Sequence, residues 1–115
     1  MIKTALFVFN GDPVCFIHVL LNAMDMRAKG FEARIVVEGA ATGLVPKLVE
    51  EDHPLHALWS KARAAGLVEG VCLACSQKMG TLDAVRDQGL PLLEDMNGHP
   101  GMAGYRLEGW EVVTF

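Results

Sequence analysis

The segment from Gly70 to Gly80 carries two thiols three residues apart, Cys72 and Cys75, where an apolar run gives way to a polar one. In an α/β protein such a change marks the carboxyl end of a strand. Ligands and chemistry gather at that edge, because loop backbone and helix N-termini face one crevice. The position therefore predicts a thiol-dependent site, and the spacing alone leaves its chemistry open.

The C-x-x-C spacing is compatible with three kinds of chemistry. A redox dithiol needs one thiolate of low pKa, usually at a helix N-terminus, and a second thiol that resolves it. A zinc site needs four ligands, or three ligands and an open position. A sulfur carrier needs one exposed nucleophilic thiolate that can hold a persulfide. Simple packing in the strand is a fourth explanation, because cysteine is among the most buried residues.

Spacing gives little support to two of these interpretations. The chain has no second C-x-x-C, and Cys15 stands alone inside a predicted helix. His53 and His56 lie close together, but His99 is far along the chain, so spacing does not make the histidines a ligand set. The thioredoxin motif lies between a first strand and a long helix, whereas the pair here follows the third predicted strand.

Residues near the cysteines offer support for a thiolate or an anion. Lys78 lies three residues past Cys75, so a helical turn places it on the same side, where its charge would stabilise a thiolate. The loop from Gly39 to Gly43 consists of small residues whose N–H groups can face an anion. It lacks the lysine of a phosphate-binding loop.

A turn at Asn10, Gly11 and Asp12 follows the first predicted strand and starts a helix. Asp12 is suited to cap that helix, and Pro13 suits its first position. Gly11 begins no dinucleotide-binding glycine pattern, so we expect no nucleotide and no other cofactor. We expect this turn to support the site as a neighbouring loop.

Apolar runs, with breaks at glycine and proline, divide the chain into strands and helices. The predicted strands cover residues 2–9, 31–38, 67–74, 90–93 and 110–115. The predicted helices cover residues 13–29, 46–51, 54–65, 81–88 and 97–109, the last opening at the Asn97-Gly98-His99-Pro100 run. In the first helix an apolar face is indicated by Val14, Ile17, Leu21, Met24 and Ala28, which recur at helical spacing.

This alternation predicts one α/β domain over residues 1–115. Right-handed crossovers give a five-stranded parallel sheet with helices on both faces, a three-layer arrangement of the Rossmann or flavodoxin kind. The loops at residues 10–13, 39–43 and 72–80 are expected to share the carboxyl edge of that sheet.

Composition limits the classes of binding partner and the cellular compartment that we expect. The net charge is -4, and the charges are interspersed without a basic stripe, which argues against nucleic acid and anionic membrane. No apolar run approaches the roughly 20 residues of a membrane span, and the first residues lack a signal-peptide cleavage pattern. Three cysteines argue against a disulfide framework and favour the cytoplasm.

The chain is more apolar than is usual for a soluble monomer. Hydrophobic residues make up 51% of it, and the mean hydropathy is +0.28. We therefore expect part of its surface to be buried between subunits of a homo-oligomer.

Several stretches occur in an order that resembles a known family. They are the Gly11-Asp12-Pro13 turn, the Gly39-Ala40 loop, the cysteine loop that ends at Gly80, the Asp95-Met96-x-Gly98-His99-Pro100 run and the closing strand from Trp110 to Phe115. Over essentially the whole chain, the sequence resembles the DsrE/DsrF-like proteins, which include the TusD sulfur-relay subunit.

The resemblance implies a DsrE-like subunit that assembles into trimers or hexamers. Relay members accept sulfane sulfur from a donor protein as a cysteine persulfide and pass it to an acceptor protein. One branch has a Val-Cys-x-Ala-Ala-x-x-x-x-Gly pattern, which places the active cysteine at Cys72. Another has Cys-x-x-Cys-x-x-x-x-Gly, which covers Cys72 and Cys75. This chain has Cys75 where the first branch has alanine, and Lys78-Met79 where an arginine pair is usual.

We therefore expect a small cytoplasmic sulfur carrier, at most a sulfurtransferase-like protein, with Cys72 and Cys75 at its site. The first alternative is a non-catalytic oligomeric module that binds a small anion or a partner protein. The second is a metal-binding protein that uses Cys72, Cys75 and a histidine.

Overall fold

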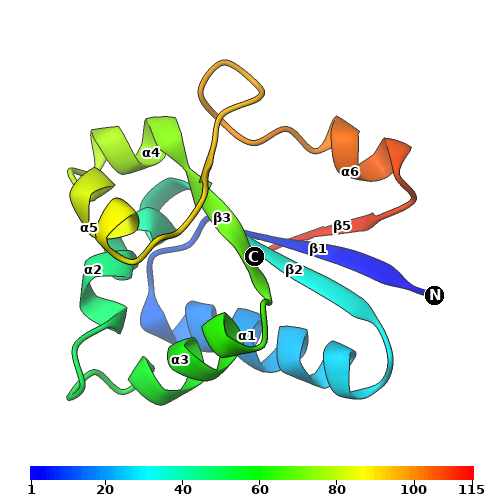
Figure 1. Cartoon of the computed structure of the whole chain (residues 1–115), viewed down its shortest axis with the longest axis horizontal. Helices are drawn as coiled ribbons and strands as arrows, with labels where there is room; N and C mark the ends of the chain where they lie inside the picture. Colours follow the sequence, from blue (N-terminus) through cyan, green and yellow to red (C-terminus); the bar gives the residue numbers. More distant parts are fainter.

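Five strands form one sheet in which every neighbouring pair is parallel, in a computed structural model that describes all 115 residues. The strands are β1 (Lys3–Val8), β2 (Glu32–Val37), β3 (Val68–Cys72), β4 (Leu92–Leu93) and β5 (Glu111–Thr114). Their order is β4-β3-β2-β1-β5, so the chain moves outward from β1 to β4 and then returns to place β5 on the other side of β1 (Figure 1).

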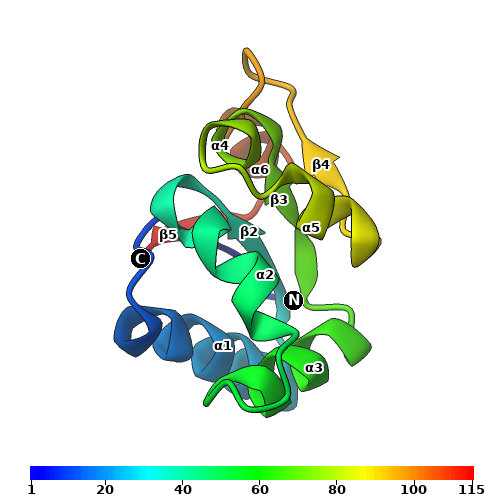
Figure 2. The ribbon, with the colours of Figure 1, turned by 90° about the vertical axis from the view of Figure 1, so that its left-hand side faces the viewer.

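Helices cover both faces of this sheet. They are α1 (Pro13–Ala28), the 3-10 helix η1 (Gly39–Leu44), α2 (Val45–Leu48), α3 (His56–Ala64), α4 (Leu73–Lys78), α5 (Leu82–Asp87) and α6 (Ala103–Leu107). Helices α1 and α3 lie on one side, and α4 and α6 lie on the other (Figures 1 and 2). The predicted three-layer α/β fold is thus confirmed. None of these helices has the length and apolar character that crossing a bilayer requires.

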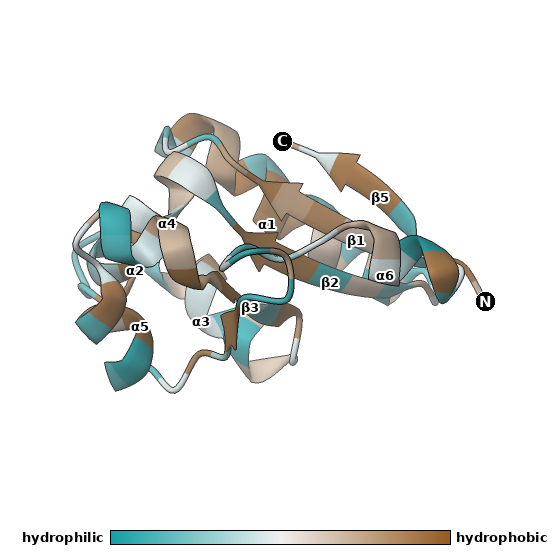
Figure 3. Cartoon of the chain, turned by 90° about the horizontal axis from the view of Figure 1, so that it is seen from above, coloured by the Kyte–Doolittle hydropathy of each residue, from teal (hydrophilic) through white to brown (hydrophobic).

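The central strands are apolar along most of their length because both of their faces are covered. Residues 5–8 of β1 and 35–37 of β2 have no exposed surface. Figure 3 shows long hydrophobic stretches along β1 and β2. Continuous apolar runs of this kind are typical of parallel strands between two helical layers.

The two faces carry cores of unequal size. One core of 20 buried residues includes Phe16 of α1 and Trp59 of α3, whose ring centroids are 6.0 Å apart. The other joins four buried residues, Ala5, Phe7, Val36 and Trp110, with the partly buried Tyr105 of α6 packed against them. Most of the hydrophobic stabilisation therefore comes from the side of α1 and α3.

Helix α1 begins as predicted, but its buried face only partly matches the predicted one. The Asp12 carboxylate accepts the Val14 N–H at 2.9 Å, and Pro13 is the first helical residue. The buried residues are Phe16, Val19, Leu20 and Ala23. Val14 and Leu21, by contrast, are 69% and 46% exposed, so the prediction was wrong for these two residues. Ile17 and Met24 are partly buried and pack against the larger core. Apolar residues occur around much of this helix, and packing against the sheet selects one stripe among them.

Three segments around the cysteines also differ from the predictions. The loop at residues 39–43 forms η1, and the strand predicted to reach residue 74 ends at Cys72, so that Cys75 lies in α4. The helix predicted from residue 97 begins only at Ala103. Asn97 and Gly98 have φ angles of 51° and 88°, which a right-handed helix cannot contain.

The neighbours Leu20 and Leu21 provide a matched test of the buried face of α1. We expect Leu20→Ala to lower the free energy of unfolding by about 2–5 kcal/mol, because it leaves a cavity in the larger core. Leu21→Ala, on the exposed side, should change it by less than about 1 kcal/mol. Urea unfolding followed by circular dichroism measures both. Equal losses for the two variants would contradict the assignment of the buried face.

Candidate functional site

Reactive or ligating side chains lie at the carboxyl ends of three adjacent strands, at one edge of the sheet. Glu38 directly follows β2, Cys72 is the last residue of β3, and His99 follows β4. Cys75 joins them from the first turn of α4. Parallel neighbours end at the same edge, so four residues from three distant stretches of the chain meet there.

The donor atoms of these four residues, which we call the Cys–His cluster, lie within 4.8 Å of one another. The Nδ1 atom of His99 is 3.1 Å from the Cys72 Sγ and 3.7 Å from the Cys75 Sγ. The same nitrogen is 3.8 Å from a carboxylate oxygen of Glu38. Glu38 and Cys72 are buried, whereas Cys75 and His99 are half-buried.

A tight turn aims His99 at the two sulfurs. The Met96 and His99 backbones exchange hydrogen bonds of 2.7 and 3.0 Å, and both central residues, Asn97 and Gly98, have positive φ. An Asn-Gly pair is the usual sequence for this primed type of turn. The Ala74 N–H donates to the Gly98 carbonyl at 2.9 Å, which ties the turn to the start of α4.

Side-chain hydrogen bonds fix the cysteine loop against its neighbours. The Ser76 hydroxyl, which is fully buried, donates to the Cys72 carbonyl at 2.7 Å. The buried Thr42 of η1 donates to the Gly39 carbonyl at 2.8 Å and lies 3.4 Å from the Cys75 carbonyl. The Cys75 N–H donates to the Cys72 sulfur at 3.4 Å, so this sulfur caps α4.

Burial shapes the protonation of Cys72 and Glu38. Loss of solvent raises the pKa of Cys72 to about 12; the Cys75 N–H opposes this shift, and the thiol of Cys75 and the charge of Glu38 add to it. Loss of solvent also raises the pKa of Glu38, while the Cys72 thiol and His99 act in the opposite direction. Cys72 is therefore a neutral thiol at pH 7 when no ligand or partner is bound.

Cys75 opens onto a cavity of about 310 Å³. The wall of this cavity is formed by Gly39, Ala40, Cys75, Lys78, Met79 and His99. Cys72 does not line it and has no exposed surface. Cys75 is thus accessible from this cavity, whereas Cys72 is not.

The structure brings together most of the residues singled out in the sequence. Lys78 and Gly39 line the same cavity as Cys75. The Asn10–Asp12 turn packs beside it, since a Cβ on Gly11 would lie 2.7 Å from the Ala40 carbonyl oxygen. Its polar side chains, however, make local bonds: Asn10 accepts the Asp12 N–H, and Asp12 caps α1.

Sequence reasoning missed Glu38, and it left open which histidine would join the cysteines. Glu38 directly follows the apolar Ile35-Val36-Val37 run and precedes a glycine, which is a signal that could have marked it. The position of His99 depends on the Asn97-Gly98 turn, a pair that we interpreted as a helix start although it is a strong turn signal.

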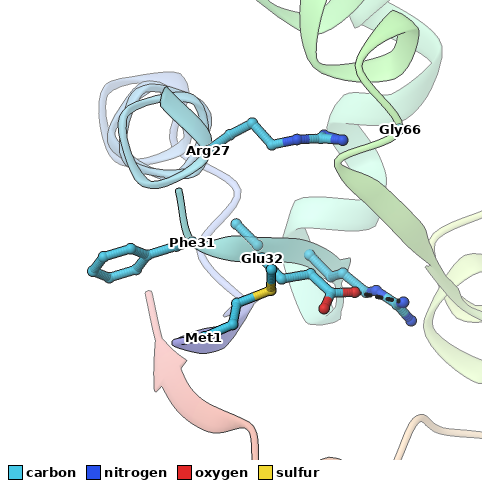
Figure 4. A pocket seen from close by; sticks show the side chains of 7 residues that line it. Met1, Arg27, Phe31, Glu32 and Gly66 are labelled. Carbon is cyan, nitrogen blue, oxygen red and sulfur yellow. Dashed lines mark hydrogen bonds and ion pairs between the residues drawn. The ribbon is translucent and has the colours of Figure 1, made fainter. Parts of the chain in front are cut away.

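A larger cavity of about 400 Å³ lies elsewhere and contains no such chemistry. Its walls include Met1, Arg27, Phe31, Glu32 and Gly66, from the region where β2 begins (Figure 4). It contains no cysteine or histidine, and its polar groups belong partly to the Arg34–Glu32 ion pair of 3.1 Å. The Cys–His cluster is therefore the better candidate site.

Comparison with known proteins gives two relatives, both archaeal. No protein-family model matches the chain, and no solved structure matches it significantly. The uncharacterized protein MJ0733 of Methanocaldococcus jannaschii is 29% identical over 96 residues, which is 84% of this chain and 76% of that protein. An uncharacterized protein of Archaeoglobus fulgidus is 38% identical over 48 residues, which is 42% of this chain and 79% of that protein.

The chain belongs to the same family as this short Archaeoglobus protein. Both relatives are described as uncharacterized, so the similarity does not indicate an activity for this chain.

The raised pKa of Cys72 predicts a loss of stability in alkaline solution. In the unfolded chain this thiol ionises near pH 8.5, whereas in the folded chain it stays protonated to about pH 12. Stability from this group is therefore complete below pH 8.5 and falls above it by at most about 1.4 kcal/mol per pH unit. Urea unfolding of chelator-treated protein between pH 7.5 and 10 measures the slope.

Cys72→Ala should flatten this slope, because the variant has no thiol to ionise at that position. Cys15→Ala, which removes a half-buried cysteine of α1, is the matched control and should keep the slope of the wild type. Parallel pH profiles for the wild type and Cys72→Ala would show that burial does not hold Cys72 protonated.

Proposed function

We propose that this protein is a sulfur carrier of the DsrE/DsrF-like kind and that Cys75, rather than Cys72, holds the persulfide. The observation that carries the proposal is the difference in access between the two thiols. Cys75 lines an open cavity, whereas Cys72 is fully buried. A persulfide carrier must meet a donor and then an acceptor, so its sulfur has to be reachable from outside the fold.

Two neighbours of Cys75 suit this chemistry. The Nδ1 atom of His99, 3.7 Å from the sulfur, is placed to take the thiol proton when the ring is neutral. Lys78 lies on the wall of the same cavity and would favour an anionic sulfur through its positive charge. The thiolate then attacks the terminal sulfur of a persulfide or polysulfide donor and displaces the donor thiolate, with no net oxidation or reduction.

Cys72 is placed to release the sulfur. Its sulfur lies within 4.8 Å of that of Cys75. Attack of the Cys72 thiol on the inner sulfur of the persulfide would form a Cys72–Cys75 disulfide, expel hydrosulfide and give up the thiol proton. An external dithiol would then restore both thiols. Transfer to the thiolate of an acceptor protein is the other route, and it returns Cys75 directly.

Intact-protein mass spectrometry after incubation with polysulfide tests the assignment. We expect the wild type and Cys72→Ala to gain the mass of one sulfur atom and Cys75→Ser to gain none. In the wild type the adduct should decay to a disulfide with release of hydrosulfide, whereas in Cys72→Ala it should persist. Cys15→Ser is the matched control and should behave as the wild type does.

Sulfur uptake by folded Cys75→Ser would assign the carrier role to another thiol. Absence of uptake by the wild type would favour a binding module instead. Circular dichroism of each variant separates loss of reactivity from loss of the fold.

We further propose that the carrier works as a cytoplasmic homo-oligomer, a trimer or a hexamer, and exchanges sulfur with donor and acceptor proteins. All three cysteines are free thiols, as a reducing compartment maintains them. Val14 and Leu21 of α1 and Val113 of β5 expose apolar surface that subunit contacts would cover.

Sedimentation equilibrium of the wild type at micromolar concentration tests this assembly. The expected mass is a threefold or higher multiple of the 12.5 kDa chain. A mass near that of the single chain would contradict it.

A further inference from the structure

We propose that Glu38, Cys72, Cys75 and His99 form a four-ligand site for a zinc ion. With zinc–ligand bonds of about 2.0–2.3 Å, a tetrahedron places its ligand atoms roughly 3.3–3.8 Å apart. The distances from the His99 nitrogen to the other three donors are 3.1, 3.7 and 3.8 Å. All four donor atoms lie within 4.8 Å of one another, so small side-chain movements complete the tetrahedron.

Hydrogen bonds alone do not account for this convergence. Three donor atoms surround the Nδ1 atom of His99, which has a single lone pair when neutral and a single proton when charged. One of the three neighbours can share a good hydrogen bond with it. An ion at the centre of the cluster would instead interact with all four groups at once.

The buried carboxylate of Glu38 also favours a bound metal ion. Its side chain is 7% exposed, and its single ion-pair partner is His99, at 3.8 Å. No lysine or arginine lies within ion-pair distance, although the more accessible carboxylates of Asp25 and Glu32 each have one. Buried carboxylates are usually paired or bind metal ions. A divalent cation would supply the positive charge that the surrounding residues do not.

The donor set selects the class of metal. Two sulfurs and an imidazole are soft or intermediate ligands that suit zinc and discriminate against magnesium and calcium. Binding replaces the proton of each cysteine thiol by a bond to the ion, so two protons are released as the complex forms. Four protein ligands leave no open position, as in zinc sites that are structural rather than catalytic.

The surroundings of the ligands are already ordered. The Cys75 N–H donates to the Cys72 sulfur, and the Met96 and Gly98 backbones hold the histidine turn. Outer contacts of this kind orient metal ligands and tune their affinity. Because the ion would use the Cys75 sulfur, bound zinc and a Cys75 persulfide exclude each other. The zinc site itself does not depend on the proposed sulfur transfer.

Titration of chelator-treated, reduced protein with Co²⁺ tests the site, because cobalt in a tetrahedral thiolate site is coloured. We expect one Co²⁺ per chain, with tetrahedral ligand-field bands and sulfur-to-metal charge transfer, and displacement of the colour by one equivalent of Zn²⁺. Cys75→Ser should lose part of the charge-transfer intensity. Glu38→Gln should weaken Zn²⁺ binding at least about 10-fold, the lower range for losing even an outer contact of a metal ligand.

Cys15→Ser and Glu50→Gln are the matched controls, because Cys15 lies in α1 and Glu50 is exposed after α2. Both should bind Co²⁺ as the wild type does. Absence of tetrahedral bands in the wild type, or equal Zn²⁺ affinity of the wild type and Glu38→Gln, would overturn the four-ligand site. Sulfur uptake by metal-free protein is measured separately, so a failed zinc site and a failed carrier role are distinguishable.

Discussion

The parallel pairing of β2, β3 and β4 is the constraint on which the site depends. Their backbone ladder aligns three carboxyl ends at one edge, and it brings Glu38, Cys72 and the turn with His99 together across more than half of the chain. A shift of one residue in the pairing of β3 would turn Cys72 to the other face of the sheet. Backbone hydrogen bonds therefore determine which side chains meet.

Close backbone contacts keep these strands and loops at the required spacing. A Cβ on Gly70 of β3 would lie 2.6 Å from the Pro91 carbonyl oxygen, so only glycine allows β4 to pair at this distance. Gly98 shows the same dependence at the histidine turn, where its φ is 88° and a Cβ would lie 3.3 Å from that of Ala74. The geometry of the site thus depends on glycines at positions where a Cβ would collide with a neighbouring strand or loop.

The sequence predicted the fold better than it predicted the site. Apolar runs and glycine breaks identified the five strands and the loop edge at Cys72 and Cys75, because those signals are local. The buried face of α1 was found only in part, since Val14 and Leu21 are exposed although they are as apolar as the residues that pack. Glu38 and His99 joined the cysteines only through strand order and a two-residue turn, which the spacing of residues along the chain does not reveal.

The smaller core has a consequence for how the cluster comes apart. Helix α6 has no buried residue, β5 is bordered by β1 alone, and the core beneath them has four buried members. Segments with so little burial open locally at a lower free energy than the whole domain. His99 lies just before this segment, and the hydrogen bond from the Ala74 N–H to the Gly98 carbonyl ties its turn to α4. How firmly the His99 ring is held against the sulfurs therefore depends on this bond as well as on the weakly packed residues 103–115.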